Sequence, residues 1–295
     1  AAELLRSVKE YSVFNEEMGR YFDTPKAYYS WYDYRIPTQT AVIEALQTIT
    51  PEDVTTIKEM QRWLLQSKRT QGWDTPLNSV DAVYAFMNGN KDNMFTTEKH
   101  LPVLKVNGSK LELPKATAGL GYVKTSCAGD NMNTFTVEKT SDGMSWGAVY
   151  AQFMQDVTDI SSASEGMTVK REIMKDGKLL ADGAQLAVGD KIKVRITVTA
   201  LRDYDFVQIV DKRAACMEPV MQLSGYRGVC YCAQGDNRTG YYFDRMSKGS
   251  HVVEAEYYVD RAGTYSTGTC TVQCAYSPEY SARAAAMTIS VSEDK

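Results

Sequence analysis

The sequence predicts an α+β chain of several domains, with helices in its first third and antiparallel β-sandwich structure in the remainder. Apolar residues recur at helical spacing up to about residue 88, and from about residue 100 the period changes to the alternation of strands. A length of 295 residues is enough for two or three domains. The composition, with 43% hydrophobic and 24% charged residues, is that of a globular protein.

The first half of the helical region contains three predicted helices. One is predicted from Glu3 to Arg20, because apolar residues stay in phase along it. A second follows Pro37 and covers Gln39–Ile49. A third starts at Thr50–Asp53, where a capping residue, a proline and two acids stand in the order typical of a helix start. Short loops between helices favour antiparallel neighbours.

The segment Lys68–Phe86 marks the end of the third helix and the start of a fourth. The basic residues Lys68 and Arg69 suit the negative end of a helix macrodipole, and Gly72 then breaks the pattern. Thr75 can cap the next helix, with Pro76 at the first position, where the missing N–H costs nothing. Apolar residues then return at helical spacing: Leu77, Val80, Val83, Tyr84 and Met87.

The beginning of the chain resembles neither a translation start nor a signal peptide. It has no initiator methionine, no charged and apolar leader and no cleavage site. We interpret the chain as a piece of a longer polypeptide, since helical arrays need neighbours to cover both faces. A processed mature start is the alternative.

Two β units are predicted after residue 98. In the first, Asn107-Gly108 is a favoured hairpin turn, and strands are predicted at Asn133–Lys139 and Trp146–Phe153. The second begins near Val169. Its clearest strand is 191–200, which alternates apolar and basic residues as a half-buried strand does. Further strands follow at sandwich-like spacing up to the end of the chain.

Charge and hydropathy exclude two classes of partner for this segment. The net charge is −4 and no cluster of five or more Lys or Arg occurs, so nucleic-acid binding is not expected. No run approaches the roughly 18 apolar residues of a membrane span. The 19 tyrosines suit strands with one wet face, so packing is the favoured explanation and an aromatic binding platform is the alternative.

Six cysteines fall mainly in the last part of the chain: Cys127, Cys216, Cys230, Cys232, Cys270 and Cys274. Partners two or four residues apart lie on the same side of a strand, about 7 Å or more from each other. Any disulfide must therefore cross to another strand, and the pairing stays open. Buried thiols are the alternative. Zinc is disfavoured, because C-x-C is shorter than the usual ligand spacing.

The sequence predicts no catalytic, cofactor-binding or metal site. Its two histidines, His100 and His251, have no H-x-x-H or H-E-x-x-H pattern. There is no G-x-S-x-G motif, and the pair Glu52-Asp53 is explained by helix capping. Gly119-x-Gly121 lacks the third glycine and following helix of a phosphate loop.

Three stretches resemble the carboxy-terminal region of the bacterial relatives of α2-macroglobulin: IPTQTAVIEAL, QRWLLQSKRTQGWDTPLNSVDAVYAF and YDFVQIVDKRAACMEP. The resemblance implies that 1–97 are the last helices of a thioester-containing domain, which is an α/α toroid. It further implies that 98–157 close a CUB-like β unit and that 158–295 form a macroglobulin-like β-sandwich.

The resemblance also implies a function. Members of the family are broad-spectrum protease traps in which a cut bait region triggers rearrangement and a thioester captures the protease. For this chain it implies a non-enzymatic part of such an inhibitor. The implied partners are host or competitor proteases and upstream domains of the same chain. The implied location is the periplasm or cell surface, and a lipoprotein parent is one form of attachment that the resemblance allows.

The thioester itself is not encoded here. It requires C-x-E-Q, and the nearest string is Cys216-Met217-Glu218-Pro219, whose proline has no side-chain amide to form the acyl bond. We interpret this string as structural; whether the parent has a thioester upstream stays open. The alternative function is an extracellular adhesion or glycan-binding module, an analogy at fold level. A toroid-type enzyme would need an acid pair and metal ligands that are missing.

Overall fold

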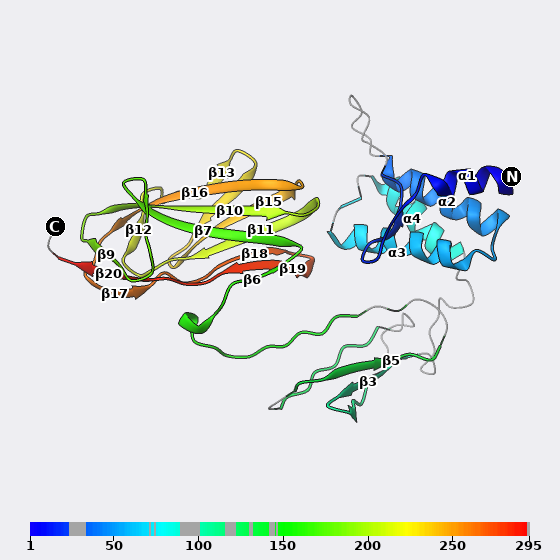
Figure 1. Ribbon diagram of the computed structural model, residues 1–295, viewed down its shortest axis with the longest axis horizontal. Coiled ribbons are helices and arrows are strands. Elements are labelled where there is room, and N and C mark those ends of the chain that lie inside the picture. The colour runs from blue at the N-terminus through cyan, green and yellow to red at the C-terminus, as the bar shows by residue number, and fades with distance from the viewer. Residues whose placement is uncertain are drawn as a thin grey trace. The chain divides into compact units, whose positions relative to one another are not determined.

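The computed structural model describes residues 1–23, 34–70, 72–73, 75–88, 101–115, 122–129, 132–141, 145 and 147–293. The chain divides into two compact units. The first comprises residues 1–65 and 73–150, and the second comprises residues 66–72 and 151–295. Helices dominate the start of the chain and antiparallel strands the rest (Figure 1), as the sequence predicts. His100, Trp146 and the predicted turn Asp142-Gly143 lie outside the described residues.

The helical region contains four helices and one hairpin among its described residues. Their bounds are α1 Ala2–Glu10, β1 Val13–Asn15, β2 Gly19–Tyr21, α2 Arg35–Ile49, α3 Val54–Thr70 and α4 Pro76–Asn88. The predicted start of α4 is confirmed, because Thr75 Oγ1 accepts a hydrogen bond from the N–H of Asn78 at 3.2 Å. At α3 the capping residue is Asp53, not Thr50: its Oδ1 accepts from the N–H of Thr56 at 3.4 Å.

The predicted helix Glu3–Arg20 is wrong beyond residue 10. Asn15 Oδ1 accepts hydrogen bonds from the N–H groups of Glu17 and Met18, both at 2.9 Å, and so closes a tight turn between β1 and β2. Gly19 has a φ of +90°, and a Cβ there would lie 2.3 Å from the carbonyl oxygen of Glu59. Only glycine permits this close approach, which overrides the helical period.

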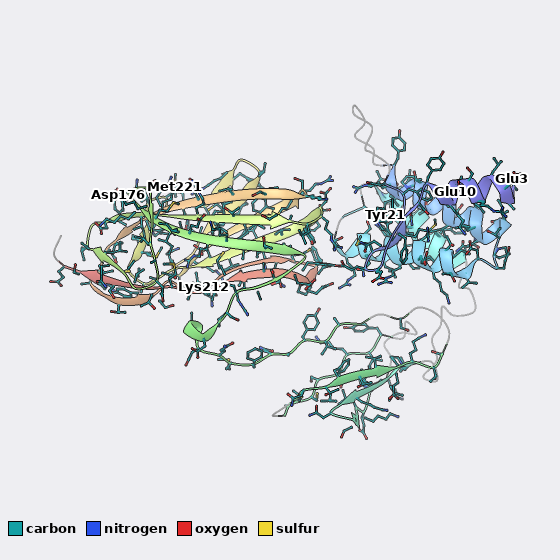
Figure 2. All side chains as sticks on the ribbon, viewed as in Figure 1. Glu3, Glu10, Tyr21, Asp176, Lys212 and Met221 are labelled. Atoms are coloured by element: carbon teal, nitrogen blue, oxygen red, sulfur yellow. The ribbon has the colours of Figure 1, made fainter. Side chains whose placement is uncertain are left out.

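The hairpin β1–β2 packs on α3 within a compact core. Tyr21, labelled in Figure 2, stacks on Trp63 with ring centroids 5.8 Å apart and planes 14° apart. The core residues of this region come from α1, the hairpin and all three later helices: Leu5, Phe22, Ile36, Ile43, Leu46, Ile57, Met60, Trp63, Leu64, Ala82 and Ala85.

Two glutamines, Gln61 buried and Gln47 half-buried, fix the end of α4. Gln47 Nε2 of α2 donates to the carbonyl oxygen of Ala85 at 2.9 Å, and Gln61 Nε2 of α3 donates to the same oxygen at 3.1 Å. Ala85 lies in the last turn, where helix carbonyls have no partner within the helix. Side chains from two helices therefore satisfy the terminus of a third.

The first β unit contains one small sheet among its described residues. It forms a three-stranded antiparallel sheet of order β4-β3-β5, with β3 Val103–Val106, β4 Ser109–Lys110 and β5 Phe135–Glu138. The predicted turn Asn107-Gly108 is confirmed, with φ of 48° and 81°. The predicted strand Trp146–Phe153 is wrong, because residues 147–153 pair with no described strand and their side chains are exposed. Alternation alone does not supply a pairing partner.

The second unit begins with a short 3₁₀ helix, Val157–Asp159, and continues as fifteen strands among its described residues. These strands are β6 Ala163–Glu165, β7 Met167–Lys175, β8 Lys178–Leu179, β9 Ala184–Ala187, β10 Lys191–Ala200, β11 Tyr204–Lys212, β12 Met217–Pro219, β13 Gly225–Arg227, β14 Cys230–Gln234, β15 Arg238–Met246, β16 Gly249–Val259, β17 Gly263–Ser266, β18 Cys270–Cys274, β19 Ser277–Ala284 and β20 Thr288–Ser292.

These strands form a two-layer sandwich. One layer has the order β12-β16-β10-β7-β8 and the other β13-β14-β15-β11-β18-β19-β6 (Figure 1), while β17-β20-β9 form a small third sheet. Pairing is antiparallel except between β20 and β9. The predicted strand at 191–200 is confirmed, since Ile192, Val194, Ile196 and Val198 are all at most 1% exposed. They pack in one core with β11, β15 and β18.

Candidate functional site

The cysteines of the second unit occupy two separated strands. Cys230 and Cys232 lie on β14, Cys270 and Cys274 lie on β18, and all four are buried free thiols. The strands β15 and β11 stand between them. Three strand spacings amount to about 14 Å, well beyond the roughly 7 Å limit for Cα atoms in a disulfide. Cross-strand disulfides between the two pairs are therefore excluded in this fold.

The string Cys216-Met217-Glu218-Pro219 lies at the edge of the five-stranded layer. Its residues Met217–Pro219 form β12, which pairs with β16 alone, and Pro219 takes a position that edge strands tolerate. Cys216 is buried, and burial raises the pKa of its thiol. The thiolate that thioester chemistry needs is disfavoured here, which agrees with a structural role for the string.

His251 is held as part of β16. Its Nε2 lies 2.6 Å from the carbonyl oxygen of Ser247, and its ring meets Phe243 edge to face at 6.3 Å. In the described part of the chain, no three His, Cys, Asp or Glu residues come together as a metal site would require. None of the described helices has the length and apolar character to span a bilayer.

The most unusual polar group of the sandwich is a buried ion pair that crosses between its layers. Arg171 of β7 and Asp211 of β11 have side chains only 3% and 1% exposed, with Arg171 Nε 2.7 Å from Asp211 Oδ1. Arg171 shares the inward face of β7 with Val169 and Ile173. Asp211 shares the inward face of β11 with Val207 and Ile209.

This ion pair was not predicted, although the sequence carries a signal for it. Val169 and Ile173 flank Arg171 on one face of the first strand, and Val207 and Ile209 precede Asp211 on one face of the second. Each charge stands where alternation predicts an apolar residue, and the two charges have opposite sign. Burial raises the pKa of Asp211 to about 6, against the opposing effect of the Arg171 guanidinium. Burial also raises the pKa of the neighbouring Cys270 thiol.

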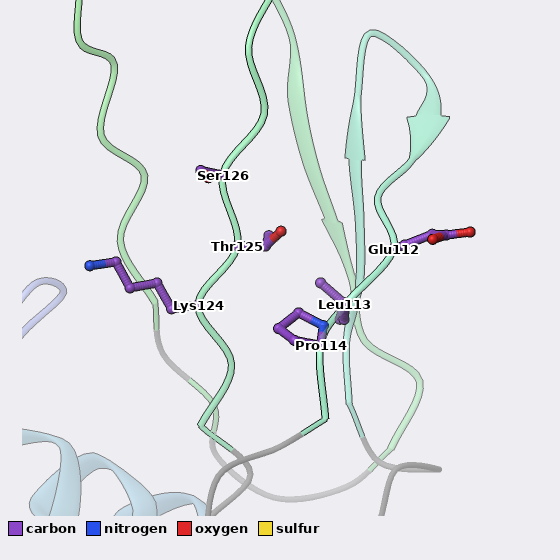
Figure 3. A pocket seen from close by; sticks show the side chains of 6 residues that line it. All are labelled: Glu112, Leu113, Pro114, Lys124, Thr125 and Ser126. Atoms are coloured by element: carbon purple, nitrogen blue, oxygen red, sulfur yellow. The ribbon is translucent and has the colours of Figure 1, made fainter.

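Neither of two surface hollows has the features of a ligand site. The hollow in Figure 3, with a volume of 620 Å³, lies between residues 112–114 and 124–126, and its charged side chains Glu112 and Lys124 point away from it. A hollow of 420 Å³ on the sandwich is lined by Lys191, Lys193, Arg195 and Glu256, among others. Its basic groups are paired with Glu254 and Glu256. Convergent unpaired polar groups, which ligand sites require, are not found in these two hollows.

The apolar residues of α4 face outward. Leu77 is 67% exposed, Val80 63% and Tyr84 52%, whereas the residues of α4 that are buried are Asn78, Ala82 and Ala85. The helical period was therefore predicted correctly, but the apolar side is not covered within the described residues. Apolar stripes of this kind mark surfaces for packing.

One pair of exposed tyrosines on the sandwich does not form a flat platform. Tyr226 and Tyr231 lie opposite each other on β13 and β14, but their rings meet edge to face at 5.3 Å with planes 76° apart. A glycan platform needs ring faces that are open to the solvent, whereas these two rings pack against each other. The geometry agrees with packing as the role of these two tyrosines.

The class of the second unit follows from its fold and from a family model. The two-layer antiparallel sandwich is macroglobulin-like, and the model of the bacterial alpha-2-macroglobulin MG10 domain matches residues 166–279. This range runs from the start of β7 into β19. The predicted kinship is confirmed for this domain, whose residues match the family model of the bacterial alpha-2-macroglobulins.

Several solved structures are similar to the chain. Trypsin-activated alpha-2-macroglobulin from Escherichia coli has 16% identity and a TM-score of 0.47, over 88% of this chain and 19% of that one. The same protein activated by porcine elastase has 18% identity and a TM-score of 0.46, over 91% and 25%. Its native form from domain MG7 to the C-terminus has 16% identity and a TM-score of 0.40, over 88% and 42%.

The chain therefore spans a fifth to two fifths of the length of these structures. No curated protein sequence matches it.

Proposed function

We propose that this chain is a structural part of a bacterial protease trap and not an enzyme. The observation that carries the proposal is the agreement between the match to the MG10 domain at 166–279 and the two-layer sandwich formed by the same residues. A sandwich closed by a continuous apolar core suits a part that moves as a rigid body when the trap is triggered.

The proposal includes a role for the two preceding segments. Residues 1–97 are the last helices of an α/α toroid, and 98–157 close a CUB-like β unit before the macroglobulin-like sandwich of 158–295. The outward apolar face of α4 supports the toroid, because a helix in such a ring has neighbours on both sides. The sheet β4-β3-β5 supports a β unit at the second position.

The partners of the complete protein are host or competitor proteases, together with upstream domains of the same chain. Its location is the periplasm or cell surface, with a lipoprotein parent as one form of attachment. The net charge of −4 and the lack of a basic cluster in the sequence leave nucleic acid out of the proposed partners.

The experiment uses the complete protein with trypsin and with porcine elastase. After the complete protein has been cut, each protease should still hydrolyse a small chromogenic peptide but lose activity on a large protein substrate. Enclosure excludes large substrates without blocking the protease active site, so this contrast is specific to a trap. A cut protein that leaves the protease uncaptured and fully active on both substrates would refute the proposal.

A protease with a blocked active site is the control. It cannot cut the complete protein, so it should not be captured, and size-exclusion chromatography should show the two proteins apart. Co-elution of the blocked protease would indicate simple adhesion and not a trap. The glycan-binding alternative is not favoured by the family match, and the edge-to-face contact of Tyr226 with Tyr231 does not support it.

A further inference from the structure

The two buried charges between the layers differ in how many hydrogen bonds the protein gives them. Nη1 of Arg171 donates to Thr267 Oγ1 at 2.9 Å and to the carbonyl oxygen of Gly268 at 3.1 Å. Nη2 donates to the carbonyl oxygens of Lys212 at 2.8 Å and Thr267 at 3.3 Å. Four neutral oxygens from the opposite side of the sandwich therefore hold the guanidinium, in addition to the carboxylate of Asp211.

Asp211 is much less well solvated by the protein. Its close charged neighbour is Arg171, and no backbone N–H donates to its carboxylate within the described part of the chain. The buried Asp190 is different, since its Oδ2 accepts from the N–H of Ala187 at 2.8 Å and pairs with Lys175 at 2.5 Å. A buried carboxylate without backbone donors is costly to keep ionised.

Each element packed around Asp211 contributes a group that affects whether its carboxyl is ionised. Arg171 comes from β7, Arg213 from the segment after β11, Cys270 from β18, and Tyr241 and Tyr257 from β15 and β16. Arg171 and Arg213 favour the ionised carboxylate, and so does a hydrogen bond from the Cys270 thiol. The thiol and the two phenols are neutral near pH 7, because burial raises the pKa of each of them.

Arg213 stabilises the ionised form of Asp211 only from a distance. Its Nη2 donates to the carbonyl oxygens of Gly235 and Asp236 at 2.5 and 3.0 Å, and its guanidinium lies 5.9 Å from the ring centroid of Tyr257. Tyr257 in turn hydrogen-bonds Thr239 at 2.9 Å. Arg213 is thus directed to the loop before β15, and Arg171 alone neutralises Asp211 at contact distance.

We infer that Arg171 and Asp211 form a proton-linked lock between the two layers of the sandwich. Asp211 takes up one proton when the medium becomes mildly acidic, and Arg171 stays in place because neutral oxygens hold it. The folded sandwich thus binds a proton that the unfolded chain binds more weakly. This inference goes beyond the proposed trap and does not depend on it.

The sign of the effect follows from linkage. Between the unfolded pKa of 3.8 and the folded value near 6, the folded state carries more protons at Asp211, so the contribution of this residue to stability falls as pH rises. From pH 4 to pH 7 the unfolding equilibrium constant should increase on the order of fiftyfold through Asp211 alone.

The test compares the full chain with Asp211→Asn in urea titrations at a series of pH values from about 4 to 7. Tyrosine near-ultraviolet circular dichroism follows unfolding, and tryptophan fluorescence separates the transition of the rest of the chain, because residues 151–295 contain no tryptophan. The unfolding constant of the unmodified chain should rise across this range by tens-fold more than that of the variant. The control Glu165→Gln removes an exposed acid from β6 and should keep the slope of the unmodified chain. Equal slopes for the unmodified chain and Asp211→Asn would overturn the inference.

A second measurement needs no variant and covers the case in which Asp211→Asn does not fold. In the full chain labelled with ¹³C at aspartate carboxyl carbons, one resonance should titrate near pH 6 while the chain remains folded. If every aspartate of the folded chain titrates below about pH 5, Asp211 is ionised throughout and the lock is not proton-linked.

Discussion

Strand β10 of the sandwich and helix α4 both have one apolar and one polar face, but the apolar face is buried in β10 and exposed in α4. In β10 the apolar residues face the core, and Ile196 is 1% exposed. In α4 the apolar residues face outward, with Leu77 67% exposed, and the small residue Ala82 lies inside. Periodicity thus predicts a secondary-structure element and its two faces. Which face is buried depends on the segments that pack against the element.

The largest expected effect comes from the covered face. Ile196→Ala leaves a cavity in a core made by both layers and should lower the free energy of unfolding of the sandwich by about 2–5 kcal/mol. Residues 151–295 contain ten tyrosines and no tryptophan, so a transition that tyrosine circular dichroism detects and tryptophan fluorescence does not is that of the sandwich. Only the tyrosine transition should move.

Thr199→Ala is the matched control for Ile196→Ala. Thr199 lies on the same strand but on its exposed side, and the change should stay within about 0.5 kcal/mol. If both variants lose the same stability, the inward face of β10 does not carry the packing energy and the contrast with α4 disappears.

The next effect concerns the polar end of α4. Gln47→Leu combined with Gln61→Leu leaves the Ala85 carbonyl without its two side-chain donors and should destabilise the helical region by about 1–3 kcal/mol, measured by tryptophan fluorescence in urea. Each single substitution should cost less than half of this, since the other glutamine still donates. Simple additivity of the single variants would show that the shared carbonyl is not the cause.

A smaller effect is expected at the start of the same helix. Thr75→Ala removes the hydroxyl that accepts from the N–H of Asn78 and should cost about 1 kcal/mol. Thr75→Ser keeps the acceptor and should cost at most a few tenths of that. Thermal unfolding followed by helical circular dichroism compares the two, and an equal loss in both variants would point to the methyl group instead of the cap.

Features that depend on neighbouring residues were predicted correctly from the sequence. The failed prediction described below depends on a contact with a distant segment. The cap at Thr75, the turn at Asn107-Gly108 and the strand 191–200 depend on residues close together in the chain, so their patterns were sufficient. The predicted helix Glu3–Arg20 failed because Gly19 contacts the backbone of Glu59 on α3. A distant segment made that contact possible, and no local pattern reports it.

The pairing of cysteines and of buried charges in the sandwich likewise could be assigned only once the strand order was known. Cysteine spacing left the disulfide pairing open, and strand order excluded bonds between β14 and β18. Arg171 and Asp211 are 40 positions apart in the sequence, and only the stacking of β7 over β11 brings them together. Inward charges in alternating strands are visible in a sequence, but their pairing is not.

The smallest effect is expected on the uncovered face of α4, and its size should depend on context. Val80→Lys places a charge on a side chain that is 63% exposed, so in the 295-residue chain the free energy of unfolding should change by less than about 0.5 kcal/mol. In the longer protein of our proposal, neighbouring helices cover this face. There the same substitution buries an unpaired charge and should cost several kcal/mol.

Comparing Val80→Lys in both contexts by tryptophan-detected unfolding therefore tests the proposed toroid directly. Asp81→Lys is the control, because Asp81 is a half-buried charged neighbour on the same helix. If Val80→Lys is as harmless in the longer protein as in this chain, the apolar face of α4 is a free surface. The difference between α4 and the sandwich would then be intrinsic to α4 and not a result of missing neighbours.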